Sequence, residues 1–203
     1  MLSDDRQLIE TPISDETVFR GALIDVSHMQ VRLPNGRTAL REIVHHKGAA
    51  AIVPVDDEEY VYLVRQHRVV NDMLTWEIPA GKLDTADEDP LHCAVRELRE
   101  ETGLTLTDYA YRGLVTFVSD RWETEYMHLF TGHTQQDPCV VCDEGDLEWV
   151  DQDKVKDLPI WTGDKIFLDL LAREVPFFYL KLSYEGDTLV QAVLNGKELS
   201  TEI

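Results

Sequence analysis

One stretch, residues 81–104, constrains this chain more than any other, because its caps, charges and apolar residues all fit one helix. Asp89 and Pro90 suit the N-cap and the first helical position, where a side-chain acceptor and a fixed φ are favoured. Gly103 suits the left-handed residue just past the helix end. We therefore expect a helix over residues 90–103. Its buried stripe, at helical spacing, comprises Leu91, Ala94, Val95, Leu98 and Thr102.

Carboxylates gather on one flank of this predicted helix. Glu97 and Glu101 are four residues apart and stack on one row, with Glu100 on the neighbouring row. Like charges at this spacing destabilise a helix unless a positive charge lies between them, and oxygen ligands suit a hard cation such as Mg²⁺ or Mn²⁺. A solvated acidic helix end is the alternative. The full pattern of residues 96–104 favours function, since it is expected at a random position with a probability on the order of 10⁻⁷.

The stretch resembles the Nudix box, G-x5-E-x7-R-E-U-x-E-E-x-G-U, in which U is aliphatic. From Glu88 onward the match is complete, with seven residues before Arg96 and the remainder of the box ending at Leu104. Six residues rather than five separate Gly81 from Glu88. All helical spacings survive, so we interpret the difference as an insertion in the loop before the helix.

Composition limits the partners and the compartment. With 203 residues the chain suffices for one domain and an accessory piece, and its net charge of −20 argues against nucleic-acid or anionic-membrane partners. No signal peptide or transmembrane run is visible, and an odd count of three cysteines predicts a reducing cytoplasm. Cys139 and Cys142 form a lone C-x-x-C, which we interpret as coincidence rather than as half a zinc site or a redox pair.

The pattern of elements predicts an α+β fold, a Nudix-type α/β/α sandwich around a mixed sheet. A β-meander comes first, a second helix lies near the end, and a hairpin closes the chain. The predicted strands are 17–26, 28–33, 37–45, 49–55, 60–65, 76–80, 109–117, 125–131, 146–150, 177–183 and 188–194, and the second helix is 164–173. We divide the chain into an N-terminal β-rich piece (1–46, after a polar, loosely held start at 1–14), a core (47–175) and a C-terminal hairpin (176–203).

Segments outside the box resemble ADP-ribose pyrophosphatases, namely residues 41–49, 63–68 and 76–83. The resemblance covers residues 17–175 and implies hydrolysis of ADP-ribose to AMP and ribose 5-phosphate. Two features depart from that family: Asp120 stands where a proline is usual, and the loop at 142–146 is short. Hydrolysis of another nucleoside diphosphate sugar, such as GDP-mannose, therefore stays open. A non-catalytic nucleotide-binding Nudix module and an acidic interaction protein are the rivals from other classes.

The resemblance also implies the catalytic roles. Glu97, Glu101 and Glu100 would hold two or more Mg²⁺ ions, with Mn²⁺ as the alternative, and the backbone carbonyl of Ala80 would complete the ligands. Arg96 would orient the carboxylates, since it can pair with Glu100 four residues later. A general base is expected in the loop after the core strands. We predict Glu144 in this role, with Asp143 as the second choice.

Substrate contacts and assembly follow from the same resemblance. We predict that Arg65 and Arg68 contact phosphate or ribose, because arginine suits bidentate anion binding; solvated strand ends are the alternative. Arg41 and Glu42 match positions that contact the nucleoside end across a dimer with exchanged N-terminal pieces, which predicts a homodimer. Adenine is expected to stack on an aromatic side chain, and the sequence does not rank the three candidates Trp76, Trp122 and Tyr126. Four histidines are expected to pack or to lie at the surface rather than to bind metal: His45, His46, His67 and His128.

Overall fold

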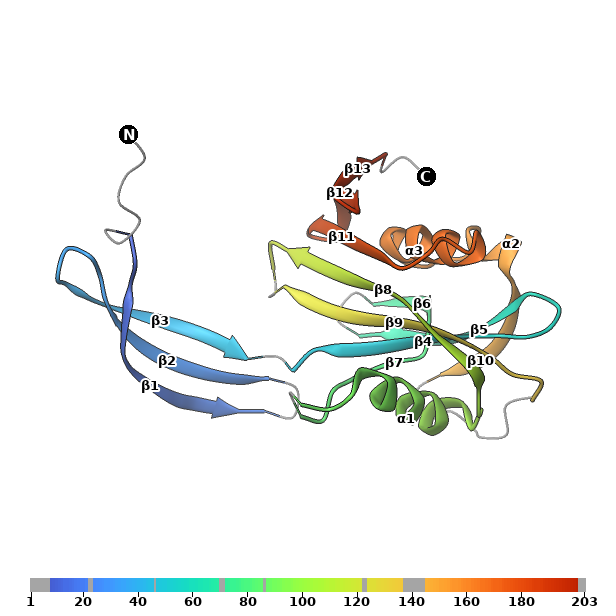
Figure 1. Cartoon of the computed structure of the whole chain (residues 1–203), viewed down its shortest axis with the longest axis horizontal. Helices are drawn as coiled ribbons and strands as arrows, with labels where there is room; N and C mark the ends of the chain where they lie inside the picture. The colour runs from blue at the N-terminus through green and yellow to red at the C-terminus, as the bar shows by residue number, and fades with distance from the viewer. Residues whose placement is uncertain are drawn as a thin grey trace. The chain divides into compact units, whose positions relative to one another are not determined.

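The structure, a computed structural model, consists of two compact units that we describe separately. It describes residues 8–21, 24–45, 47–69, 72–85, 87–121, 124–136 and 145–200. The units are Met1–Lys47 and Gly48–Ile203, and Figure 1 labels their helices and strands. Within the described ranges, no helix has the length and apolar character needed to cross a membrane.

The N-terminal unit is an antiparallel three-stranded sheet in the order β1-β2-β3. Its strands are β1 (Thr11–Arg20), β2 (Asp25–Arg32) and β3 (Thr38–His45). The predicted strand 17–26 is wrong, because the chain turns within it: the N–H of Gly21 donates to the carbonyl of Ile24 at 2.9 Å. The predicted loose start at 1–14 is also wrong from Thr11 onward, where β1 begins.

The second unit is built on one mixed sheet in the order β10-β5-β4-β9-β8-β11-β12-β13, with β6 paired to β5 and β7 to β4. Pairs β4–β9 and β8–β11 are parallel, and the other pairs are antiparallel. The strands are β4 (Ala49–Val55), β5 (Tyr60–Arg68), β6 (Met73–Glu77), β7 (Ala80–Lys82), β8 (Thr107–Ser119), β9 (Glu125–His133), β10 (Asp146–Asp151), β11 (Phe178–Glu185), β12 (Thr188–Leu194) and β13 (Lys197–Leu199).

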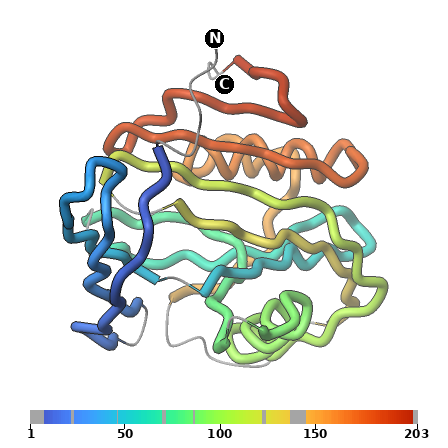
Figure 2. Tube along the Cα trace, turned by 60° about the vertical axis from the view of Figure 1, so that its left-hand side comes forward, coloured from blue at the N-terminus to red at the C-terminus, as the bar shows by residue number. Residues whose placement is uncertain are grey.

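Helices cover both faces of this sheet, which confirms the predicted mixed-sheet sandwich. The helices are α1 (Pro90–Thr102), α2 (Gln152–Val155) and α3 (Thr162–Ala172). Figures 1 and 2 show α1 and α3 on opposite sides of the sheet. The short α2 and β13 were not predicted from the sequence, since each is only one turn or three residues long.

Two buried apolar clusters fill the two layers. The cluster under α1 joins buried residues of that helix to residues of β4, β5 and β9 and of the segments that flank the helix: Ala50, Ile52, Tyr62, Leu83, Cys93, Ala94, Leu98, Leu104, Leu106 and Phe130. The cluster under α3 is larger and includes Phe167, Phe178, Leu180 and Leu182, all at most 1% exposed. Burial on both faces explains why β4 is almost continuously apolar.

The C-terminal hairpin extends the sheet instead of standing apart from it. Strand β11 runs parallel to β8, with Phe178 opposite Gly113. The turn between β11 and β12 is fixed to the end of β8, because Asp120 Oδ1 accepts a hydrogen bond from the N–H of Gly186 at 2.8 Å. Arg121 lies 3.6 Å from Asp187 in the same contact.

A buried carboxyl lies in the first turn of α3. Burial, together with the negative charge of Glu77, raises the pKa of Asp164 to about 8 from an ordinary value of 3.8. The folded chain therefore holds this proton at pH values where the unfolded chain has lost it. The stability that this proton contributes is complete below pH 3.8 and is lost as the pH rises through 8.

We expect Asp164→Asn to stabilise the chain, relative to the parent, more at pH 9 than at pH 5, because the amide is neutral at both. Each pKa unit of difference is worth about 1.4 kcal/mol, and each kcal/mol about 2–4 °C in a chain of this size. Thermal unfolding of both proteins at the two pH values measures this. An equal difference in Tm at pH 5 and pH 9 would contradict the assignment.

Candidate functional site

Helix α1 begins and ends where its local sequence dictates. The side chain of Asp89 accepts hydrogen bonds from the N–H groups of Leu91 and His92 at 2.8 and 3.3 Å. Gly103 has a φ of 72°, and its N–H donates to the carbonyl of Arg99. The buried side is rotated from the predicted stripe: it comprises Cys93, Ala94, Leu98 and Thr102, whereas Leu91 and Val95 are only partly buried.

Arg96 stands among four carboxylates. Its Nη1 donates to Glu97 Oε1 at 2.6 Å and lies 3.7 Å from Glu100 Oε2. Its Nε lies 3.5 Å from Glu88 Oε1 and 3.7 Å from Asp84 Oδ2. Arg96, Glu97 and Glu88 are mostly buried, whereas Glu100 and Asp84 are exposed. One guanidinium therefore offsets the repulsion that the acidic flank would otherwise suffer.

The electrostatics of Arg96 follow from these contacts. Burial lowers its pKa, but the hydrogen bond and charge of Glu97, with the charge of Asp84 and the side-chain contact of Glu88, outweigh that effect and raise the pKa. The side chain is permanently charged. Its Nε is the one buried side-chain nitrogen or oxygen, among the residues that the structure describes, without a hydrogen-bond partner.

Strand β7 and the loop after it complete the acidic side of α1. A Cβ added to Gly81 would lie 1.9 Å from Cδ of Glu97, so only glycine lets β7 approach this carboxylate. Glu88 folds back on the segment after β7, since its Oε2 accepts from the N–H of Asp84 at 2.6 Å. Glu88 reaches Arg96 although six residues, and not five, separate it from Gly81.

Cys93 is not a candidate metal ligand. Its Sγ donates to the carbonyl of Gly81 at 3.6 Å. Burial, followed by the charge of Glu88, raises the pKa of this thiol to about 11. The thiolate that a metal requires is therefore rare at neutral pH.

The donor set around α1 fits a hard cation, although the carboxylates now surround Arg96. In the described part of the chain, no three His, Cys, Asp or Glu side chains are placed to hold a metal ion. Oxygen donors are nevertheless concentrated here: Glu97 and Glu100 at Arg96, Glu101 partly buried on the same flank, and Ala80 exposed beside Gly81. Carboxylate and carbonyl oxygens are the ligands that Mg²⁺ and Mn²⁺ prefer.

The predicted substrate arginines lie in both units. Arg68 forms a two-point ion pair with Glu77, and the guanidinium of Arg65 lies 5.8 Å from the centre of the Trp76 ring. In the N-terminal unit, Arg41 donates from Nε and Nη2 to Glu10 at 3.1 and 2.5 Å. Glu42, in that same unit, lies 3.5 Å from His28. Among the predicted site residues that the structure describes in the second unit, Arg96 lies together with Glu97 and Glu100.

Some predicted residues lie outside the described residues. They are Asp143 and Glu144 of the expected base loop, Cys139, Cys142, Trp122 and His46. Four acidic side chains that pair with the predicted arginines were not predicted as site residues from the sequence: Asp84, Glu88, Glu77 and Glu10. Of these, Glu88 had a signal in the box spacing. Glu77 had none, because its contacts depend on the register of β6 against β5.

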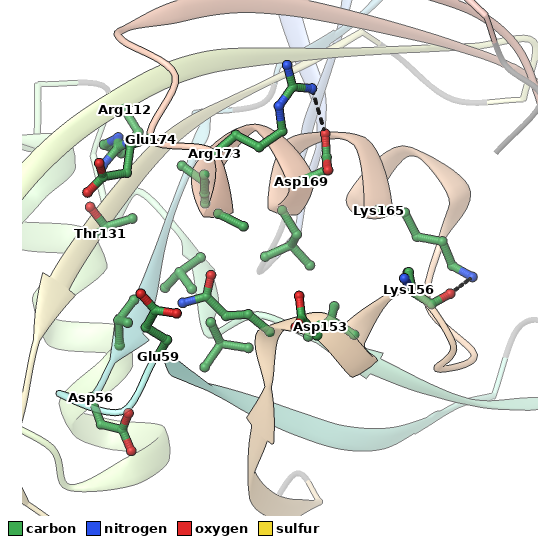
Figure 3. Close-up of a pocket in the computed structure, with 18 of the residues that line it drawn as sticks. Asp56, Glu59, Arg112, Thr131, Asp153, Lys156, Lys165, Asp169, Arg173 and Glu174 are labelled. Carbon is green, nitrogen blue, oxygen red and sulfur yellow. Dashed lines mark hydrogen bonds and ion pairs between the residues drawn. The ribbon is translucent and has the colours of Figure 1, made fainter.

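Described residues of the second unit line a cavity on each side of the sheet. One of about 780 Å³ lies along α1 and Tyr109, and Arg96 and Glu100 line it. The other, of about 760 Å³, lies between α3 and the β4–β5 end of the sheet (Figure 3) and contains no residue of the box. Arg173 is paired with Asp169 at its rim. The acidic side of α1 therefore remains the candidate active site.

The second unit is an α/β/α sandwich, and the acidic side of its helix α1 is suited to divalent cations. The NUDIX domain model matches residues 45–171. A similar protein is the ADP-ribose pyrophosphatase of Bacillus subtilis (strain 168), 39% identical over 125 residues, which are 62% of this chain and 66% of that protein. The ADP-ribose pyrophosphatase of Mycobacterium tuberculosis (strain ATCC 25618 / H37Rv) is 48% identical over 92 residues, 45% of this chain and 44% of that protein.

The chain is also similar to a third protein by sequence and to a solved structure. The methanol dehydrogenase activator of Bacillus methanolicus is 38% identical over 122 residues, 60% of this chain and 64% of that protein. The crystal structure of a MutT protein from Bacillus halodurans has a TM-score of 0.64 at 25% identity and covers 73% of this chain and 97% of that one. The chain spans less than two thirds of the length of each of these three relatives found by sequence.

This chain belongs to the NUDIX family, as the box predicted. The family match and the relatives support the predicted class of enzyme, a Nudix pyrophosphohydrolase.

We expect Gly81→Ala to lower metal-dependent turnover by about 10–100-fold, the usual cost of disturbing the surroundings of a metal ligand. The added Cβ would displace the Glu97 carboxylate. The clash involves the mobile end of a side chain, so Tm should change little. Turnover with Mg²⁺ and a thermal melt measure the two effects. Parental turnover in a folded variant would show that Glu97 tolerates displacement and would contradict its role.

Proposed function

We propose that this chain hydrolyses the pyrophosphate bond of ADP-ribose to give AMP and ribose 5-phosphate, with Mg²⁺ or Mn²⁺ as cofactor. The observation that carries the proposal is the set of carboxylates on α1 gathered around Arg96 at the box spacing. The relatives named ADP-ribose pyrophosphatase support the choice of substrate.

Glu97, Glu101 and Glu100, with the backbone carbonyl of Ala80, would hold two or more cations. Such cations, when bound, polarise a phosphoryl oxygen and lower the pKa of water. They also answer an electrostatic problem, because a chain with a net charge of −20 must bind a diphosphate. The chain's own part is to keep these oxygens on one flank. Arg96 does so through its contacts with Glu97 and Glu100.

The proton of the attacking water needs an acceptor on the chain. We assign this role to the carboxylate of Glu144, with Asp143 as the second choice, on the resemblance to ADP-ribose pyrophosphatases alone. Glu144→Gln should lower kcat and leave KM close to the parental value, since a base acts on the water and not on the bound nucleotide.

Arginines would supply the remaining positive charge for the substrate. Arg65 and Arg68 lie at the end of β5 and are exposed, as phosphate or ribose contacts must be. Arg41 and Glu42 would contact the nucleoside end of the substrate that a second copy of the chain binds, which makes the proposed assembly a homodimer. We expect a small nucleotide sugar as the partner, rather than nucleic acid or a membrane. A cytoplasmic location rests on the cysteine content and stays a prediction.

One observation favours a second candidate, another nucleoside diphosphate sugar such as GDP-mannose. Asp120, which stands in place of the usual proline, holds the turn of the β11–β12 hairpin through Gly186. The end of β8 therefore carries an acidic side chain that binds the hairpin turn, where the pattern of ADP-ribose pyrophosphatases has a proline.

A substrate panel with product identification tests the specificity. We expect ADP-ribose to show the highest kcat/KM among ADP-ribose, GDP-mannose and other nucleoside diphosphate sugars, with AMP and ribose 5-phosphate as products. If ADP-ribose is turned over no faster than the others, the proposed specificity is wrong.

Glu101→Gln tests the metal assignment. We expect metal-dependent turnover to fall at least about tenfold, with the fold retained, because Glu101 belongs to a charge cluster and not to the apolar core. Glu174→Gln, which removes an exposed carboxylate just after α3, is the matched control and should retain turnover. Parental activity of the Glu101 variant at limiting Mg²⁺ would refute this role.

A further inference from the structure

The hairpin of β5 and β6 carries a polar cluster that the proposed mechanism does not use. The antiparallel register places Gln66 opposite Thr75, Arg68 opposite Met73, and Val64 opposite Glu77. Because side chains alternate along a strand, Gln66, Arg68, Thr75 and Glu77 share one face of the hairpin.

Glu77 is the centre of this cluster. Its Oε1 accepts from Nε of Arg68 at 2.8 Å and from Oγ1 of Thr75 at 2.6 Å. Its Oε2 accepts from Nη2 of Arg68 and from Nε2 of Gln66 at 3.4 Å. A carboxylate offers about four acceptor sites, so these four hydrogen bonds account for its capacity.

Exposure rises in steps from the base of the cluster to its tip. Thr75 is 3% exposed, the side chain of Glu77 14% and that of Arg68 49%. The buried threonine thus fixes the carboxylate, and the carboxylate fixes an arginine that reaches solvent. Two parallel hydrogen bonds also set the plane of the guanidinium, which a single contact would leave free to rotate.

We propose that Glu77 is a positioning residue that, seated on Thr75, holds the Arg68 guanidinium in the orientation that receives a phosphate or ribose hydroxyl of the substrate. The proposal rests on the proposed function and on the predicted role of Arg68. It gives Glu77 no contact with the reacting atoms. An arginine ordered before binding loses less side-chain freedom when the substrate arrives.

Glu77→Gln tests this with a separation of KM from kcat. The amide keeps the shape of the side chain but replaces one acceptor by a donor, so the two-point contact with Arg68 is lost. We expect KM for ADP-ribose to rise about three- to tenfold, the loss expected from leaving one long side chain unordered. The kcat should stay within about twofold of the parental value.

Companion variants separate positioning from structure. Arg68→Lys keeps the charge but loses the fork, and should raise KM to a similar extent. When Glu77→Gln is added to Arg68→Ala, KM should rise no further, because both substitutions remove the same contact. The matched control is Asp169→Asn, which removes the carboxylate of the exposed Arg173 ion pair on α3 and should leave KM unchanged.

The results distinguish this inference from the proposed function. If Glu77→Gln lowers Tm but leaves KM at the parental value, Glu77 is structural and the inference is overturned. If the parent prefers another nucleotide sugar, the same KM comparison is made with that sugar, and only the specificity fails. If the parent turns over none, calorimetric binding of ADP-ribose replaces KM, and equal Kd values for parent and Glu77→Gln overturn the inference.

Discussion

The second unit depends on one contact, that of the buried Arg96 with the carboxylates around it. Without this guanidinium, acids at helical spacing would repel one another and weaken α1. Glu97 at 2.6 Å is the strongest partner, and Glu88 at 3.5 Å ties in the loop before the helix. The same contact explains why Gly81 is needed, since β7 must pass close to Glu97. Helix, loop and strand are thus held together by charge on one side of α1 and by the apolar cluster on the other.

Arginines in this acidic chain are held by its own glutamates. Arg41 pairs with Glu10, Arg68 with Glu77 and Arg96 with Glu97. In this chain of net charge −20, each of these three arginines already has a carboxylate partner before a substrate binds. Such pairs cost a substrate little if it contacts another part of the guanidinium, and they order a side chain that would otherwise be mobile. In the proposed mechanism, cations on α1 would supply the charge that these paired arginines cannot.

Local signals in the sequence predicted what depends on neighbouring residues. Helix α1 was predicted because Asp89, Pro90 and Gly103 are residues typical of helix ends and the apolar residues between them recur at helical spacing. The mixed sheet and the family followed from the apolar runs and the box. The turn at Gly21 was missed, because apolar side chains occur on both sides of Gly21 and only the hydrogen bond to Ile24 reveals the break. The contacts of Glu77 and the burial of Asp164 depend on strand register and on packing between distant elements, which composition and spacing do not encode.

We propose that the carboxylates around Arg96 form a site for divalent cations. Calorimetric titration of the parent and of Glu97→Gln with Mn²⁺ tests it most directly, with Glu174→Gln as the control for loss of one negative charge. The account predicts that Glu97→Gln weakens Mn²⁺ binding at least about tenfold, while the control retains parental affinity. Equal affinities for parent and Glu97→Gln would contradict it, and the acidic flank of α1 would then be a solvated surface.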